Sequence, residues 1–126
     1  MREEGYRIQA RMVKALAHPT RLQMLAVLRG GERCACKFGP LLGLGQANVS
    51  QHLGILRKAQ LVDTRRDGTR IMYSLADERT PHVLDTLAEI ARDQFMEAAA
   101  ALRTVASGQG GLPDHRRHRT PCSRCL

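Results

Sequence analysis

An amphipathic helical segment followed at once by a hairpin pattern restricts the fold of this chain more than any other feature. Across residues 46–58, QANVSQHLGILRK, apolar side chains occupy the i, i+4 and i+7 positions of one helix face: Val49, Leu53 and Leu56. The next residues, LVDTRRDGTRIMYSL, are two strand-like runs around Asp67-Gly68, a dipeptide suited to a tight hairpin turn. Glycines at 43 and 45 separate the helix from a shorter one before it. This order predicts a winged helix-turn-helix.

The rest of the chain is predicted to be mainly α-helical, with the hairpin as a small β element. Aromatic residues make up only 3% of the 126 residues, so the core must be built from aliphatic side chains, which suit helices. Apolar spacing predicts a helix over residues 6–17, interrupted by HPT, and a second one that begins at Pro19 and ends at Gly30-Gly31. A last helix is expected to begin at a Thr80 cap and to close at Ser107-Gly108.

The last helix carries a heptad seam in which apolar residues alternate steps of four and three. The seam consists of Leu84, Ala88, Ala91, Phe95, Ala98, Leu102 and Val105. Its small residues would let another helix approach closely, and packing within one chain is one interpretation of the seam. We expect residues 1–107 to form one domain. Residues 108–126, which begin with a Gly-rich linker, are expected to form a flexible basic tail that contains cysteines.

The charge balance favours a polyanionic partner. With 20 basic and 12 acidic residues the net charge is +8, which is typical of nucleic-acid binding, with an anionic membrane surface as the alternative. No apolar run is long enough to span a bilayer, and the first residues lack a signal-peptide core, so we expect a cytoplasmic protein with no membrane association. No nucleophile–base arrangement, phosphate-binding loop or carboxylate pair supports an enzyme.

The helix over residues 46–58 and the hairpin together predict a surface that binds double-stranded DNA. Short polar groups on the helix can reach base edges in the major groove, and the arginines at the hairpin tip can reach phosphate or the minor groove. The predicted contacts are Gln46, Ala47, Asn48, Ser50, Gln51, His52, Arg57, Lys58, Arg65, Arg66 and Arg70. An ordinary solvated helix face is the alternative. His52 lies toward the flank of the buried face, where packing is as good an interpretation as a DNA contact.

Three stretches resemble the ArsR/SmtB family of metal-responsive repressors. The stretch NVSQHLGILRKAQLV resembles the family's recognition helix, LAHPTRLQMLAVL its second helix and RRDGTRIMYSL its wing. The resemblance covers residues 13–75. It implies a homodimer formed through the first and last helices, which binds an inverted-repeat operator and releases it when an inducer binds.

The four cysteines occur as one CxC pair and one CxxC pair, spacings that favour metal ligands in a reducing compartment. ERCACKF is similar to the cysteine box of the arsenic- and cadmium-sensing branches, which implies that Cys34 and Cys36 are inducer ligands. Gly39 stands where the arsenic branch can have a further cysteine. Other branches use C-terminal cysteines, so we expect Cys122, Cys125 or both to complete the site.

The family resemblance, closest to the arsenic-sensing branch, makes As(III) or Sb(III) the expected inducer, with Cd, Pb or Zn as alternatives. The opposing interpretation of Cys34 and Cys36 is that they are two small buried apolar residues. If both begin the first helix of the helix-turn-helix, their side chains point about 200° apart, and joint ligation would require local unwinding.

Two further hypotheses remain open for the cysteines. The first is a repressor that senses oxidants or persulfides through its thiols. A disulfide between Cys34 and Cys36 would be strained, whereas a bond between Cys36 and the tail is feasible. The second is a zinc site in the tail, formed by His115 and His118 together with the CxxC pair, although the loop between the ligand pairs is far shorter than in zinc fingers.

Overall fold

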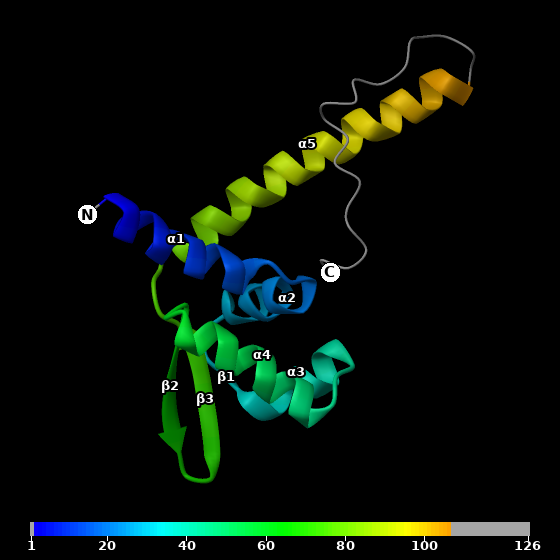
Figure 1. The fold of residues 1–126 in the computed structure, drawn as a ribbon. Helices are drawn as coiled ribbons and strands as arrows, with labels where there is room; N and C mark the ends of the chain where they lie inside the picture. The colour runs from blue at the N-terminus through cyan, green and yellow to red at the C-terminus, as the bar shows by residue number, and fades with distance from the viewer. Residues whose placement is uncertain (1, 107–126) are drawn as a thin grey trace. The chain divides into compact units, whose positions relative to one another are not determined.

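The computed structural model describes residues 2–106, which fall into two units, residues 2–81 and 82–106, and each unit is described by itself. In chain order the elements are α1 (Arg2–Leu16), α2 (Pro19–Leu28), β1 (Arg33–Cys34), α3 (Ala35–Leu42), α4 (Gln46–Lys58), β2 (Val62–Asp67), β3 (Arg70–Leu75) and α5 (Thr80–Ala106) (Figure 1). This order confirms the predicted winged helix-turn-helix, mainly α-helical with a β wing. No helix in the described range has the length and apolar character needed to cross a membrane.

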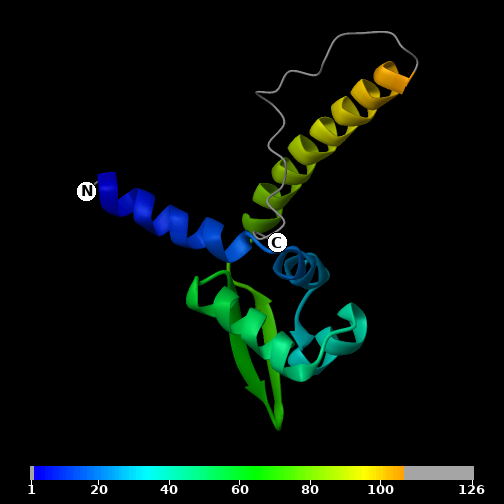
Figure 2. The same ribbon diagram turned by 45° about the vertical axis from the view of Figure 1, so that its right-hand side comes forward.

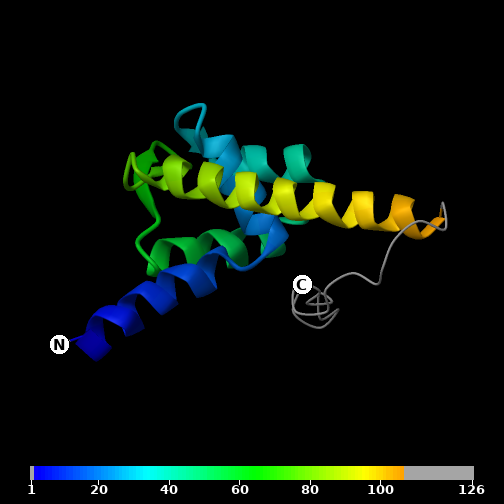
Figure 3. The same ribbon diagram turned by 90° about the horizontal axis from the view of Figure 1, so that it is seen from above.

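The junction between α1 and α2 lies where the sequence predicts it. α1 ends at Leu16, and Pro19 occupies the first turn of α2, where a missing N–H costs nothing. The cap comes from an unexpected residue: the Nδ1 atom of His18 accepts a hydrogen bond from the Thr20 amide at 3.1 Å. α1 packs against α2 and α4 (Figure 3).

The core of the first unit lies between α2, α3, α4 and the wing. α4 contacts α2, α3 and β2 (Figure 2). The predicted apolar face of α4 is confirmed, because Val49, Leu53 and Leu56 are all buried. Phe38 of α3, one of only two phenylalanines in the chain, is fully buried and anchors α3 in this core. These contacts hold α4 with its opposite face toward solvent.

The wing has one strand more than predicted and a turn one residue away from the predicted place. β1 pairs with β3 in an antiparallel sheet of order β1-β3-β2. Because Asp67 pairs with Arg70, the turn residues are Gly68 and Thr69 rather than Asp67-Gly68. The positive φ of 64° at Gly68 then falls at the first central position, which glycine occupies in type II′ turns.

α5 is a single helix of 27 residues. Thr80 is its first residue rather than its cap. An Asp77 carboxylate oxygen, just before the helix, accepts the Arg79 amide at 2.8 Å. Large apolar side chains of α5 are exposed, among them Phe95 and Leu102, each at 71%. The pairing of the heptad seam stays a prediction, and the predicted boundary at residue 107 and the tail lie outside the described residues.

Candidate DNA-reading surface and thiol site

The exposed face of α4 carries the polar residues that the sequence predicts to read DNA. Burial of Val49, Leu53 and Leu56 on one side orients this face outward. Seven of the predicted contacts on α4 are exposed: Gln46, Ala47, Asn48, Ser50, Gln51, Arg57 and Lys58. Apart from Ala47 they carry polar side chains, and the two cations, Arg57 and Lys58, lie in the last turn of the helix. Such a surface can contact base edges and phosphates.

The three arginines of the wing differ in their contacts. Arg70 lies 3.6 Å from the Asp67 carboxylate across the turn. Arg65 makes a two-pronged ion pair with Glu32, in which Nε lies 2.7 Å and Nη2 lies 2.5 Å from the two carboxylate oxygens. Arg66 is exposed and forms no ion pair within residues 2–106. Arg66 is therefore the wing arginine with the fewest competing contacts for a phosphate.

His52 is turned away from the exposed face of α4. Its ring centroid lies 4.5 Å from that of His18, at the α1–α2 junction. Arg21 Nη1 lies 3.3 Å from His52 Nδ1, and because a guanidinium can only donate, Nδ1 accepts. The Nε atom of Arg21 also donates to the carbonyl of Ala15 at 2.5 Å. Of the two interpretations of His52, these contacts favour packing: the ring and Arg21 join α4 to the end of α1.

This cluster predicts a pH-dependent term in stability. Burial, followed by the nearby His18 and Arg21, lowers the pKa of His52 from its ordinary value of 6.5. The unfolded chain therefore binds more protons than the folded one just below pH 6.5. We expect the contribution of His52 to the free energy of unfolding to be fully present above pH 6.5 and to be lost as the pH falls through the lowered pKa.

Urea unfolding between pH 5 and pH 8 checks this expectation. His52→Gln should remove part of the loss of stability at low pH. His82→Gln, at an exposed position on α5, is the matched control and should leave the dependence unchanged. Equal pH profiles for the parent and His52→Gln would contradict the prediction.

Cys34 and Cys36 lie at the start of α3, where β1 gives way to the helix. Cys34 is the N-cap residue, with extended backbone and 5% exposure, and Cys36 is the second helical residue. The Cys34 sulfur accepts the Cys36 amide at 3.3 Å. The two Sγ atoms face each other as a close pair. The pair can thus exist as a bonded disulfide or, when reduced, as two adjacent thiols.

The premise behind the expected unwinding is wrong. It assumes that both cysteines are helical, but Cys34 precedes the helix and has a ψ of 140°, so its side chain turns over the first turn of α3. The start of α3 is also weakly held, because Pro40 cannot donate the helical hydrogen bond to the Cys36 carbonyl. The two sulfurs therefore lie close together with α3 intact.

A third ligand is absent from the part of the chain that the structure describes. In residues 2–106 no three His, Cys, Asp or Glu side chains are grouped closely enough to hold a metal ion. At Gly39 a Cβ atom would lie 3.0 Å from the backbone oxygen of Leu44, so a cysteine there would be crowded. The candidate ligands Cys122 and Cys125, like His115 and His118, lie outside the described residues.

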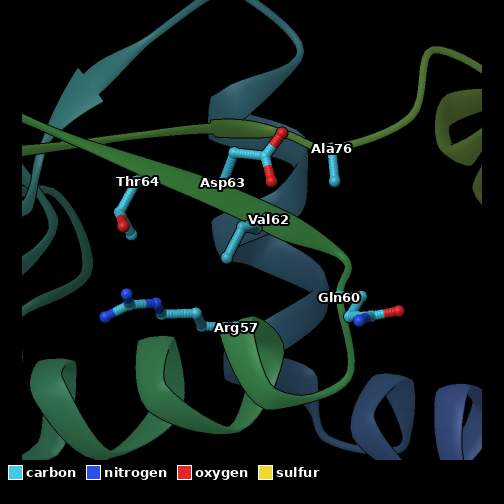
Figure 4. A pocket seen from close by; sticks show the side chains of 6 residues that line it. All are labelled: Arg57, Gln60, Val62, Asp63, Thr64 and Ala76. Carbon is cyan, nitrogen blue, oxygen red and sulfur yellow. The ribbon is translucent and has the colours of Figure 1, made fainter.

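A hollow of about 430 Å³ lies between the end of α4 and strand β2. Arg57 reaches along it from α4, and Thr64 faces it from the strand (Figure 4). Gln60, Val62, Asp63 and Ala76 complete its lining.

Comparison with known proteins agrees with this architecture. Residues 18–64 match the sequence profile described as "Bacterial regulatory protein, arsR family". The chain is 38% identical to the "Biofilm growth-associated repressor" of Agrobacterium fabrum over 76 residues, 60% of this chain and 65% of that protein. It is 41% identical to the "Probable mercury resistance operon repressor" of Streptomyces lividans over 93 residues, 74% of this chain and 71% of that one.

Two solved structures are similar to the described fold. One is the homodimeric winged helix-turn-helix DNA-binding domain Mb0332 of Mycobacterium bovis, with a TM-score of 0.67 and 32% identity over 72% of this chain and 84% of that one. The other is reduced HlyU of Vibrio cholerae, with a TM-score of 0.62 and 30% identity over 70% of this chain and 93% of that one. With its reading helix, its wing and these relatives, the chain belongs to the ArsR family of winged helix-turn-helix transcriptional regulators, which are not enzymes.

Proposed function

We propose that this protein is a homodimeric repressor that binds an inverted-repeat operator through α4 and the wing. The exposed polar face of α4, set by the burial of its opposite face, is the observation that carries the proposal. Dimerisation is supported by the homodimeric Mycobacterium bovis relative and by the exposed apolar residues of α1 and α5, including Tyr6, Val13 and Phe95. A two-fold dimer presents two reading helices, which matches the symmetry of an inverted repeat.

We infer that the inducer is a thiophilic ion, As(III) or Sb(III) in the first place, bound by Cys34 and Cys36. Their convergence at the start of α3 supports this inference. Three thiolates suit these trivalent ions, so Cys122 or Cys125 would supply the third. Cd, Pb and Zn are alternatives. Hg is a further alternative, because the Streptomyces lividans relative is a probable mercury resistance operon repressor.

The thiols can influence DNA binding through the packing of α3 against α4. α3 begins at the thiol pair and packs against α4. An ion bound by both sulfurs will hold them at one fixed separation and will therefore favour one placement of the start of α3. It weakens DNA binding if the conformation with the tighter ion site is the one that binds DNA less well.

Thiol oxidation is a second candidate function, favoured by the closeness of the Cys34 and Cys36 sulfurs. A peroxide would take two electrons and two protons from the two thiols, the sulfurs would bond, and the peroxide would leave as two waters. The reduced state of the Vibrio cholerae relative is compatible with such chemistry. Mass spectrometry separates the candidates: a bound ion at fixed stoichiometry supports the first, and a loss of two protons supports the second.

Operator release is the decisive experiment. Arsenite, antimonite, cadmium, lead, zinc, mercury and hydrogen peroxide are each titrated against the protein–operator complex, with the intact chain and with one truncated after Gly111. We expect an ion to release the operator from the intact chain, and truncation to raise the required concentration about tenfold or more, because a thiolate ligand is lost. If truncation leaves the titration unchanged, the tail supplies no ligand.

A further inference from the structure

The ion pair between Glu32 and Arg65 connects two parts of the sequence that are 33 residues apart. Glu32 lies directly before β1, and Arg65 lies in the middle of β2. Both Nε and Nη2 of Arg65 contact the carboxylate, in the fork geometry that makes arginine–carboxylate pairs specific. The pair lowers the pKa of Glu32 and raises that of Arg65, as expected when each charge stabilises the other.

The sheet register aligns this ion pair with the thiol site. Cys34 is opposite Met72, and Met72 is opposite Arg65, so the three residues form one row across the three strands. Glu32 precedes Cys34 by two positions, which places the two side chains on the same face of an extended chain. The ion pair therefore crosses over β3 on the face that carries Cys34, and connects the outer strand of the wing to the residues that hold the sensor.

We propose that Arg65 is a positioning residue, which ties the wing to the sensor strand through Glu32 so that a change at Cys34 and Cys36 moves the wing as well as α4. This inference rests on the proposed function, because it concerns how the thiol site controls DNA binding. Arg65 thereby differs from its neighbour Arg66, which has no such partner within the described range and remains a predicted DNA contact.

Two different interactions hold β1 in the wing: its backbone pairing with β3 and the Glu32–Arg65 ion pair. β1 is only two residues long, so its pairing with β3 alone would hold it loosely. The Glu32–Arg65 pair adds a second connection, which spans β3 and joins the start of β1 to β2. With the ion pair in place, a displacement of Cys34 moves Glu32 and therefore also Arg65. Without the ion pair, β1 can move while the hairpin of β2 and β3 keeps its position.

The test compares Glu32→Gln, Arg65→Gln, the combined variant and the charge exchange Glu32→Arg with Arg65→Glu. Arg66→Gln is the matched control, since it removes the neighbouring exposed arginine of the wing. Operator affinity is measured for each full-length protein with and without a saturating inducer, identified on the parent protein in the titration above. Thermal melting verifies that each variant folds, and a thiol titration reports inducer binding separately from DNA.

We expect the ratio of operator affinities, without and with inducer, to fall about fivefold in both single variants and no further in the combined one. The charge exchange should restore the ratio, because it rebuilds the pair with opposite polarity. Arg66→Gln should weaken operator binding with and without inducer alike and leave the ratio unchanged.

Four outcomes would overturn the proposal. If Arg65→Gln behaves like Arg66→Gln, and the charge exchange makes operator binding worse, Arg65 is a phosphate contact. If Glu32→Gln tightens operator binding, Glu32 competes with DNA for Arg65. If the parent responds to an inducer and every variant responds equally, the pair transmits nothing, whereas a parent that responds to no ion or oxidant refutes the sensor function itself and this inference with it.

Discussion

Replacing both Cys34 and Cys36 with serine will abolish release by the inducer, raising the concentration needed by more than about a hundredfold, while operator affinity of the reduced protein stays within about threefold. We expect inducer release to be lost while operator affinity is kept, because Cys34 has two separate roles. Its sulfur caps α3 by accepting the Cys36 amide, and serine is among the best N-cap residues, so the hydroxyl can take over that hydrogen bond. A serine hydroxyl is a poor ligand for a soft ion and cannot form a disulfide.

Electrophoretic mobility shifts with increasing arsenite, antimonite or cadmium measure this effect. Cys122→Ser with Cys125→Ser is the matched control, and it should weaken the response without removing it, because Cys34 and Cys36 remain. Cys34→Ala gives an independent measure of the cap, with an expected loss of about 1 kcal/mol in the free energy of unfolding. Full inducer response in the variant that combines Cys34→Ser with Cys36→Ser would refute the assignment of these thiols as the sensor.

Local sequence patterns are sufficient to predict the helices α2 and α4. The bounds of α4, residues 46–58, follow from its apolar spacing and from the glycine that precedes it. α2 follows in the same way from Pro19 and the glycines beyond its end. In both cases the determining forces act within a few residues, through side-chain periodicity and backbone preference.

Contacts between distant residues could not be predicted in the same way. β1 is two residues long and has no period of its own, and it exists because β3, almost 40 residues later, offers a free edge. The position of Cys34 before α3, rather than within it, depends on that pairing. The same holds for the contact of His52 with His18 and for the ion pair of Arg65, since neither partner carries a local signal of the other.

Gln51→Ala is expected to weaken operator binding about 5- to 100-fold, the cost of one hydrogen-bonded base contact. Gln51 lies on the exposed face of α4, two positions from the buried Leu53, and its amide can both donate and accept. Alanine favours the helix at least as well as glutamine, so the fold should keep its stability.

Quantitative footprinting on the operator and on a scrambled duplex, at one fixed salt concentration, distinguishes base-specific contacts from non-specific electrostatic attraction. Gln51→Ala should reduce operator affinity and leave non-specific affinity almost unchanged, because it removes no charge. Lys58→Gln, at the end of the same helix, should weaken binding to both duplexes and reduce the salt dependence by about one phosphate contact. Gln23→Ala, an exposed position on α2, is the matched control for loss of an amide outside the reading helix. If Gln51→Ala binds the operator as tightly as the parent, this side of α4 does not enter the major groove, and the orientation of the domain on DNA must be assigned differently.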